Sequence, residues 1–266
     1  MSAIGRGIRL TIAIAAALMS FGVGAVRAGE VSVASAAAVR LPLEAAAAIS
    51  DSAIGERLTM SFGTAGAVVD RVAGGQVVDV VVLPPVRLEQ LVARGLVEPD
   101  GRAPLGTVRL GLAVRAGTPR PTIATEAEIR AALLAAPSIG LADPAAGATT
   151  GIFFAKRLGD MGLAATLQPR IRLFADGTAA VEAVARGEVA LAMGQMSEIR
   201  PVAGVDVVGP LPDALQLRTV YAAGVATHAS RPEAARATIA LLRSGKLAAA
   251  FLSAGFDPPD EAPSAH

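Results

Sequence analysis

Short apolar segments and alanine-rich helical segments alternate along most of this 266-residue chain. Glu30–Ala34 is a predicted strand, and a predicted helix over Ala37–Ser50 follows it. Leu58–Phe62 and Thr64–Gly74 repeat this order, and the fully apolar strand Val77–Leu83 then ends at two prolines. Repeated strand–helix units predict an α/β protein with mostly parallel sheets and helices on their faces.

The same alternation continues through the rest of the chain. Further strands are predicted over Arg109–Arg115, Ser138–Ala142, Ile171–Phe174, Val189–Met193, Val205–Val208 and Tyr221–Ala226. Further helices are predicted over Leu88–Arg94, Thr125–Ala135, Gly151–Asp160, Thr178–Arg186, Pro232–Leu242 and Leu247–Ser253. This length suits either one large sheet or two lobes.

The first 28 residues have the order of segments that defines a secretory signal peptide. Arg6 and Arg9 give a positive start, the apolar run Leu10–Ala25 follows, and small residues precede a cut predicted after Ala28. The alternative is an uncleaved membrane anchor, but the apolar run is short for a spanning helix. We therefore expect an exported protein that works in the periplasm.

Composition excludes several classes of function. Removing the three arginines of the signal peptide takes the formal charge from +1 to −2, which gives no footprint for nucleic acid. Aromatic residues are only 3% of the chain, which argues against a sugar site built on stacked rings. With no cysteine and two histidines, the chain has almost no material for a metal site or a catalytic triad. We predict no metal and no cofactor.

Three loops of small and hydroxyl residues follow predicted strands. They are Ser35–Arg40, Gly63–Gly66 and Asp143–Gly151, and each opens a predicted helix. Ligands of open α/β sheets lie beyond the carboxyl ends of the strands. A helix N-terminus there offers free backbone N–H groups to an anion. The loops together predict an anion site of neutral donors, although each could simply cap its helix.

The order and spacing of several motifs resemble those of a known family. The motifs are Ser35–Arg40, Phe62–Gly66, Val78–Leu83, Leu110–Gly117, Asp143-Pro144 with Gly147 and Gly151, Ala185–Val189, Gly209–Pro212 and Tyr221–Ala226. Over nearly the whole mature chain they resemble the type 2 periplasmic solute-binding proteins, within them the molybdate-binding-protein-like group. The resemblance implies a monomer with two lobes, 29–110 plus 222–266 and an inserted 111–221, which close on a small anion and present it to an ABC transporter permease.

The resemblance also implies which residues bind the ligand. They are Ser35, Gly63, Thr64, Ala146, Gly147, Thr149, Thr150, Gln195 and Ser197. Arg40, which lies near the first loop, is added as a candidate on its charge. Molybdate binders usually have a tyrosine at the wall where this chain has Gln195-Met196-Ser197-Glu198, and the chain looks more like a subgroup that includes bacterial aconitate isomerases. Arg40 and Gln195 would suit carboxylates, although Arg40 could also lie on a solvated helix face.

Three functions remain open from the sequence. The first is a transport protein that binds a small anion. The second is an aconitate isomerase, in which Glu198 or Asp143 would act as the base. Asp143 is better explained as a turn before Pro144, and Glu198 could simply face solvent. The third is a sensory domain that binds a ligand for another membrane partner.

Overall fold

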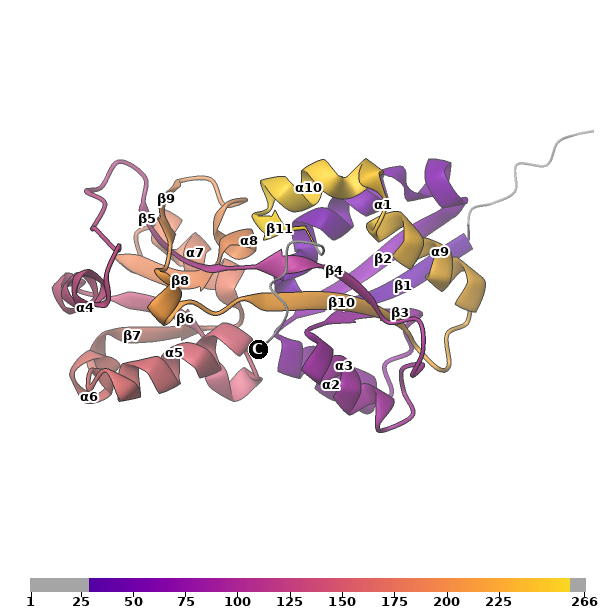
Figure 1. Cartoon of the computed structure of the whole chain (residues 1–266), viewed down its shortest axis with the longest axis horizontal. Coiled ribbons are helices and arrows are strands. Elements are labelled where there is room, and N and C mark those ends of the chain that lie inside the picture. Colours follow the sequence, from indigo (N-terminus) through magenta and orange to yellow (C-terminus); the bar gives the residue numbers. More distant parts are fainter. Residues whose placement is uncertain (1–28, 259–266) are drawn as a thin grey trace, which may run out of the picture.

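The computed structural model describes residues 29–258. Two separate sheets lie end to end along the long axis, and helices cover both of them (Figure 1). The predicted signal peptide, with its cut after Ala28, lies outside the described residues. We call the unit around the six-stranded sheet lobe I and the unit around the five-stranded sheet lobe II.

Lobe I is built on a sheet with the strand order β11-β4-β10-β3-β1-β2. Its strands are β1 (Gly29–Ala36), β2 (Glu56–Gly63), β3 (Val80–Leu83), β4 (Ala103–Val108), β10 (Thr219–Val225) and β11 (Phe256–Asp257). Its helices are α1 (Arg40–Ile54), α2 (Ala65–Ala73), α3 (Pro85–Val92), α9 (Pro232–Leu242) and α10 (Ala248–Ser253). The C-terminal helices α9 and α10 pack beside α1, so the two ends of the described chain share one lobe.

Lobe II is built on a sheet with the order β7-β6-β8-β5-β9. Its strands are β5 (Leu110–Arg115), β6 (Ile139–Ala142), β7 (Ile171–Phe174), β8 (Leu191–Gln195) and β9 (Val205–Pro210). Its helices are α4 (Glu126–Ala135), α5 (Thr149–Asp160), α6 (Ala164–Leu167), α7 (Gly177–Ala185) and α8 (Met196–Ile199). The chain crosses between the lobes twice, from β4 to β5 and from β9 to β10. The predicted lobe boundaries, 29–110 plus 222–266 and 111–221, stay predictions.

The predicted α/β class is confirmed, but the prediction of mostly parallel sheets is wrong. Strands β1, β2 and β3 pair in parallel, as do β6, β7 and β8. The crossing strands β4, β5, β9 and β10 pair in antiparallel ladders. The second crossing returns the chain in the opposite direction, so both sheets become mixed. Pattern alone did not reveal this, because a buried antiparallel strand is as apolar as a parallel one.

Most predicted strands and helices are present, but β4 was missed. Its sequence contains Pro104 and Gly106, which normally weaken a strand assignment. Proline is tolerated here because β11 pairs only with Thr107 and Val108, which leaves β4 without a neighbour on that side at Pro104. The predicted helix that begins at Thr125 is confirmed, with Thr125 and Glu128 forming a reciprocal capping box.

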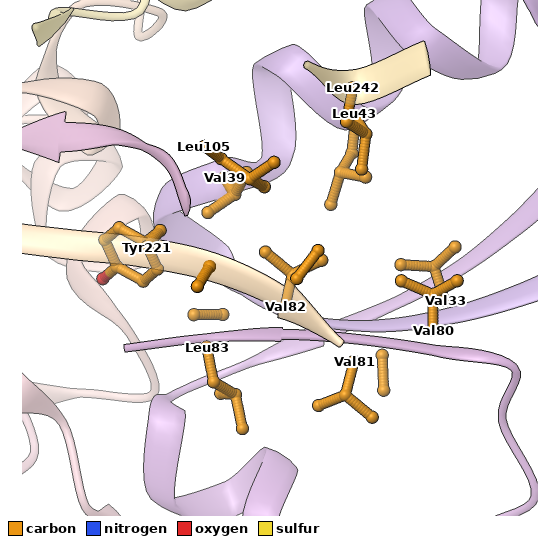
Figure 2. Packing of buried hydrophobic residues seen from close by; sticks show 14 of the residues in the cluster. Val33, Val39, Leu43, Val80, Val81, Val82, Leu83, Leu105, Tyr221 and Leu242 are labelled. Carbon is orange, nitrogen blue, oxygen red and sulfur yellow. The ribbon is translucent and has the colours of Figure 1, made fainter. Parts of the chain in front are cut away.

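The core of lobe I consists largely of valine and leucine from its central strands. Val80, Val81, Val82 and Leu83 are fully buried, since helices cover both faces of strand β3. Figure 2 shows Tyr221 at the margin of this cluster, with its hydroxyl pointing away from the valines. The core therefore holds the aromatic ring while the polar end of the side chain faces the space between the lobes.

Candidate functional site

A small cavity lies between the two lobes. Lobe I contributes Ala36–Ala38, Gly63–Ala65 and, from crossing strand β10, Tyr221. Lobe II contributes Ala142, Ala148–Thr150, Asp176, Gly177, Gln195 and Glu198. The cavity volume is about 20 Å³, close to the space that one water molecule requires. A ligand much larger than water would therefore need the lining side chains or the lobes to move apart.

Helix N-termini from both lobes converge on this cavity. Ala36–Ala38 lie at the turn that leads into α1, and Thr64 caps α2 by accepting a 3.1 Å hydrogen bond from the Ala67 N–H. In lobe II, Thr149 begins α5, and Asp176 caps α7 through the Ala179 N–H. These N-termini direct partial positive charge and backbone donors toward the same space. The arrangement suits an anion without any cationic side chain.

Six of the residues singled out from the sequence line this cavity. They are Gly63, Thr64, Thr149, Thr150, Gln195 and Glu198. Among them Thr64, Thr150, Gln195 and Glu198 are buried. Their role in binding stays a prediction, but the structure brings them together from three separate segments of the chain.

The other predicted residues of the first loop and of the Gln195–Glu198 segment lie outside the cavity lining. Ser35 is fully buried, and its hydroxyl donates to the Ala36 carbonyl at 2.9 Å. Arg40 lies on α1, where its guanidinium stacks 4.1 Å above the centroid of the Phe62 ring. Ser197 is buried, and its hydroxyl has no partner among the described residues.

The remaining predicted residues belong to the β6–α5 loop. Asp143 uses its carboxylate to accept the Ala145 N–H at 2.8 Å, which is a turn and not a base aimed at the cavity. Ala146 and Gly147 contact lobe I beside the cavity and do not line it. The second base suggested by the sequence, Glu198, thus lies at the cavity, whereas Asp143 does not.

Ala146 and Gly147 form a contact that joins the lobes. The Gly66 N–H donates to the Gly147 carbonyl at 3.1 Å, and the Thr64 hydroxyl donates to the Ala146 carbonyl. A Cβ atom on Gly66 would lie 2.6 Å from the Gly147 Cα, which is closer than atoms pack. Two glycines are therefore needed for the lobes to approach this closely.

Glu198 is a buried carboxyl at the lobe II wall of the cavity. Burial raises its pKa to about 7, and the nearby Asp176 acts in the same direction. Hydrogen bonds from the backbone N–H groups of Gln195 and Gly177 oppose that rise. A carboxyl whose pKa is near neutrality can both accept and return a proton at physiological pH.

Gln195 is the most completely buried side chain among the predicted ligand residues that line the cavity. It exposes 2% of its surface, and its Oε1 accepts the hydroxyl of Tyr221 at 3.0 Å. The same side chain accepts the Glu198 N–H, in a capping box at the start of α8. Its carbonyl end is therefore occupied by two donors from different elements.

Sequence reasoning missed Tyr221, Asp176 and Gly177 as cavity residues. Asp176 and Gly177 had a readable signal, because Asp-Gly-Thr follows the predicted strand Ile171–Phe174 and opens a helix, as the three chosen loops do. Tyr221 had none, since it was the first residue of a strand and not part of a loop. Only the crossing of β10 between the lobes brings it to the cavity.

Residues 29–258 contain neither a membrane-spanning helix nor a metal-binding cluster. No helix in this range is long and apolar enough to span a membrane. Within the same range, no group of three or more histidine and acidic side chains is arranged to hold a metal ion.

Comparison with known proteins identifies the family. The profile of the bacterial extracellular solute-binding proteins matches residues 31–257, which is nearly all of the described chain. This chain belongs to that family. It is also 35% identical over 196 residues to an aconitate isomerase from Pseudomonas sp, with 73% of each chain covered.

Solved structures show the same fold. The periplasmic molybdate-binding protein of Azotobacter vinelandii superposes with a TM-score of 0.72 at 20% identity, covering 86% of this chain and 99% of that chain. The sulfate-binding protein SubI of Mycobacterium tuberculosis H37Rv has a TM-score of 0.70 at 18% identity, covering 88% of each chain. At these identities the likeness shows the fold alone, and the predicted two-lobed binding-protein architecture is thereby confirmed.

Proposed function

We propose that this protein works in the periplasm, where it binds a small carboxylate anion between its lobes; trans-aconitate is the first ligand to test. One observation carries this proposal, namely the convergence of helix N-termini from both lobes on one buried cavity. The 35% identity to an aconitate isomerase supports the choice of ligand. Because aconitate is larger than this cavity, its binding would require the lining side chains or the lobes to move apart.

A transport role follows from this binding. A ligand that contacts both lobes favours the closed state by its extra contacts there, and that state can be recognised by a membrane permease. The membership in a solute-binding family supports an ABC transporter permease as the partner. The predicted monomeric state remains part of this proposal.

A second candidate function is the isomerisation of aconitate, and Glu198 is the observation that favours it. The reaction removes a proton from one carbon, shifts the double bond, and returns a proton one allylic position away. Ionised Glu198 would take the first proton and then return it, so the two steps balance without a cofactor. Its pKa of about 7 makes both protonation states accessible. The helix N-termini would stabilise the charge that spreads into the carboxylates.

The two functions differ in their pH dependence. Ionised Glu198 repels an anion, so affinity in a pure binding protein should fall as the pH rises through about 7. An isomerase needs the ionised form, so turnover should rise over the same range. The pH profile thus distinguishes a binding protein, in which Glu198 must be neutral, from an isomerase, in which Glu198 must be ionised.

The test is proton NMR of trans-aconitate incubated with the mature protein between pH 6 and pH 8. Appearance of the cis isomer, abolished by Glu198→Gln with binding retained, would support the isomerase. Line broadening without conversion would support carboxylate binding alone. An unchanged spectrum at all pH values would reject aconitate as the ligand, and calorimetry with molybdate and sulfate would follow.

A further inference from the structure

Gln195 can be oriented in only one way by the groups around it. Its side chain accepts the backbone N–H of Glu198, and a backbone N–H can only donate. The atom that faces Glu198 is therefore the carbonyl Oε1 and not the amide Nε2. Tyr221 contacts the same Oε1 at 3.0 Å, so the tyrosine hydroxyl must donate to it.

The opposite end of the amide is left free. Within residues 29–258 the hydrogen bond recorded with another side chain uses the Gln195 Oε1 and not its Nε2, and Gln195 lines the cavity. An amide N–H that borders the cavity without a protein acceptor is free to bind a partner there. A ligand oxygen in the cavity would be that partner.

We infer that Tyr221 is a positioning residue, which locks the Gln195 amide so that its two Nε2 hydrogens face the cavity and select ligands bearing acceptor oxygens. Tyr221 belongs to crossing strand β10, whereas Gln195 ends β8 in lobe II. The hydrogen bond between them links the crossing strand to the wall of the ligand cavity. This inference rests on the proposed function only for the identity of the ligand.

The locked orientation has a chemical consequence. A carboxylate or another oxyanion carries acceptors only, so it can pair with both Nε2 hydrogens. A ligand that presents an N–H at this place meets two donors and loses a hydrogen bond, whereas a hydroxyl oxygen can still accept one. Without the tyrosine hydroxyl, Gln195 would keep one donor on Oε1 and could turn its carbonyl toward the ligand in part of the population.

The first arm of the test needs no ligand. In a proton–nitrogen correlation spectrum, the side-chain amide pair of Gln195 is assigned by its loss in Gln195→Glu. In the intact protein this pair should be well dispersed, and in Tyr221→Phe it should move toward the shifts of a freely rotating amide. Tyr221→Phe keeps the ring that packs edge-on against Phe256 at a centroid distance of 6.0 Å.

Phe256→Leu is the matched control, because it disturbs the same packing and keeps the hydroxyl. If this control shifts the Gln195 pair as far as Tyr221→Phe does, the tyrosine acts through packing and the inference is overturned. The same holds if Tyr221→Phe leaves the pair unchanged.

The second arm is a calorimetric titration with trans-aconitate. Tyr221→Phe should weaken binding roughly ten-fold, since a single oriented hydrogen bond is lost, and Gln195→Glu should weaken it further by adding charge. Unchanged affinity in Tyr221→Phe would contradict the inference. If the unaltered protein does not bind trans-aconitate, the proposed ligand fails, while the spectra of the first arm still decide whether Tyr221 orients Gln195.

Discussion

The carboxylate of Glu198 lies where a side chain on Gly177 would begin. A Cβ atom built on Gly177 would overlap both carboxylate oxygens of Glu198. Glycine at position 177 therefore lets α7 and α8 of lobe II approach each other and brings a carboxyl group against the N-terminus of α7. The close approach also buries Glu198, and that burial is the largest cause of its raised pKa.

Gly177→Ala should displace the Glu198 carboxylate from the cavity wall. Helix propensity favours alanine in α7 by up to about 1 kcal/mol, but overpacking a buried site costs about 1–3 kcal/mol. We expect a net loss of unfolding free energy, measured by urea denaturation. The control is Gly159→Ala in α5, where an added Cβ would meet no atom within 4 Å; equal effects of the two changes would contradict the steric account.

Glu198 should make the protein less stable as the pH rises toward neutrality. Its folded pKa of about 7 exceeds the ordinary value of 4.5, so its stabilising contribution is complete below pH 4.5 and is lost as the pH rises through 7. Between pH 5 and pH 8 the free energy of unfolding should fall by roughly 2–3 kcal/mol from this group.

Glu198→Gln is the control for this pH dependence, because glutamine does not ionise. The free energy of unfolding of the variant, measured in urea, should change less between pH 5 and pH 8 than that of the unaltered protein. If the free energy of unfolding changes equally with pH in the two proteins, Glu198 does not titrate in this range.

Gly66→Ala should keep the lobes from closing fully. The added methyl group would lie 2.6 Å from the Gly147 Cα, so the hydrogen bond between the Gly66 N–H and the Gly147 carbonyl could not form. Small-angle scattering should give a larger radius of gyration, while thermal stability should not fall, because alanine favours helix α2. A radius equal to that of Gly159→Ala would contradict this role of the glycine pair.

Asp79→Asn should destabilise lobe I. Burial raises the pKa of Asp79, but hydrogen bonds from Ser32, Ser230 and the Arg231 N–H outweigh this and lower it. These bonds tie β1 to the segment before α9. The NH2 group of an asparagine would point at groups that can only donate or that now donate to the carboxylate. This should lower the unfolding free energy, measured in urea at pH 7, by about 2–3 kcal/mol.

Asp213→Asn is the matched control, since the Asp213 side chain is 88% exposed and forms a surface ion pair with Arg218. Surface pairs of this kind contribute about 0–1 kcal/mol. If the two asparagine variants lose equal stability, the buried network around Asp79 is not what holds these segments together.

The alternation of apolar strands and alanine-rich helices was enough to predict most elements and the α/β class. The prediction succeeded because the periodicity of apolar side chains, and the prolines and glycines that end an element, act within a few residues of the chain. It failed at β4, where Pro104 and Gly106 look like breakers and the strand forms by pairing with β10 and β11, which lie far along the chain. It also failed to predict that the crossing strands would make both sheets mixed.

The candidate site could be predicted only in part, because the local sequence does not encode contacts between distant residues. Thr64, Thr149 and Gln195 were found because loops that open helices have a local signature of hydroxyl, amide and glycine residues. Arg40 was proposed on its charge, but it stacks on Phe62 and does not line the cavity. Whether a charged side chain faces a cavity or covers a neighbour depends on packing that the local sequence does not encode.

The sequence by itself thus determined the class of fold, the family resemblance and the segments that open helices toward an anion, all of which follow from short-range pattern. The tertiary structure alone decided which of those segments meet. It joined Gly66 to Gly147 across the lobes, buried Glu198 so that its pKa rises to about 7, and brought the Tyr221 hydroxyl to Gln195. Each of these depends on desolvation or on contact between residues distant in the chain, and both arise only when the elements pack in the folded protein.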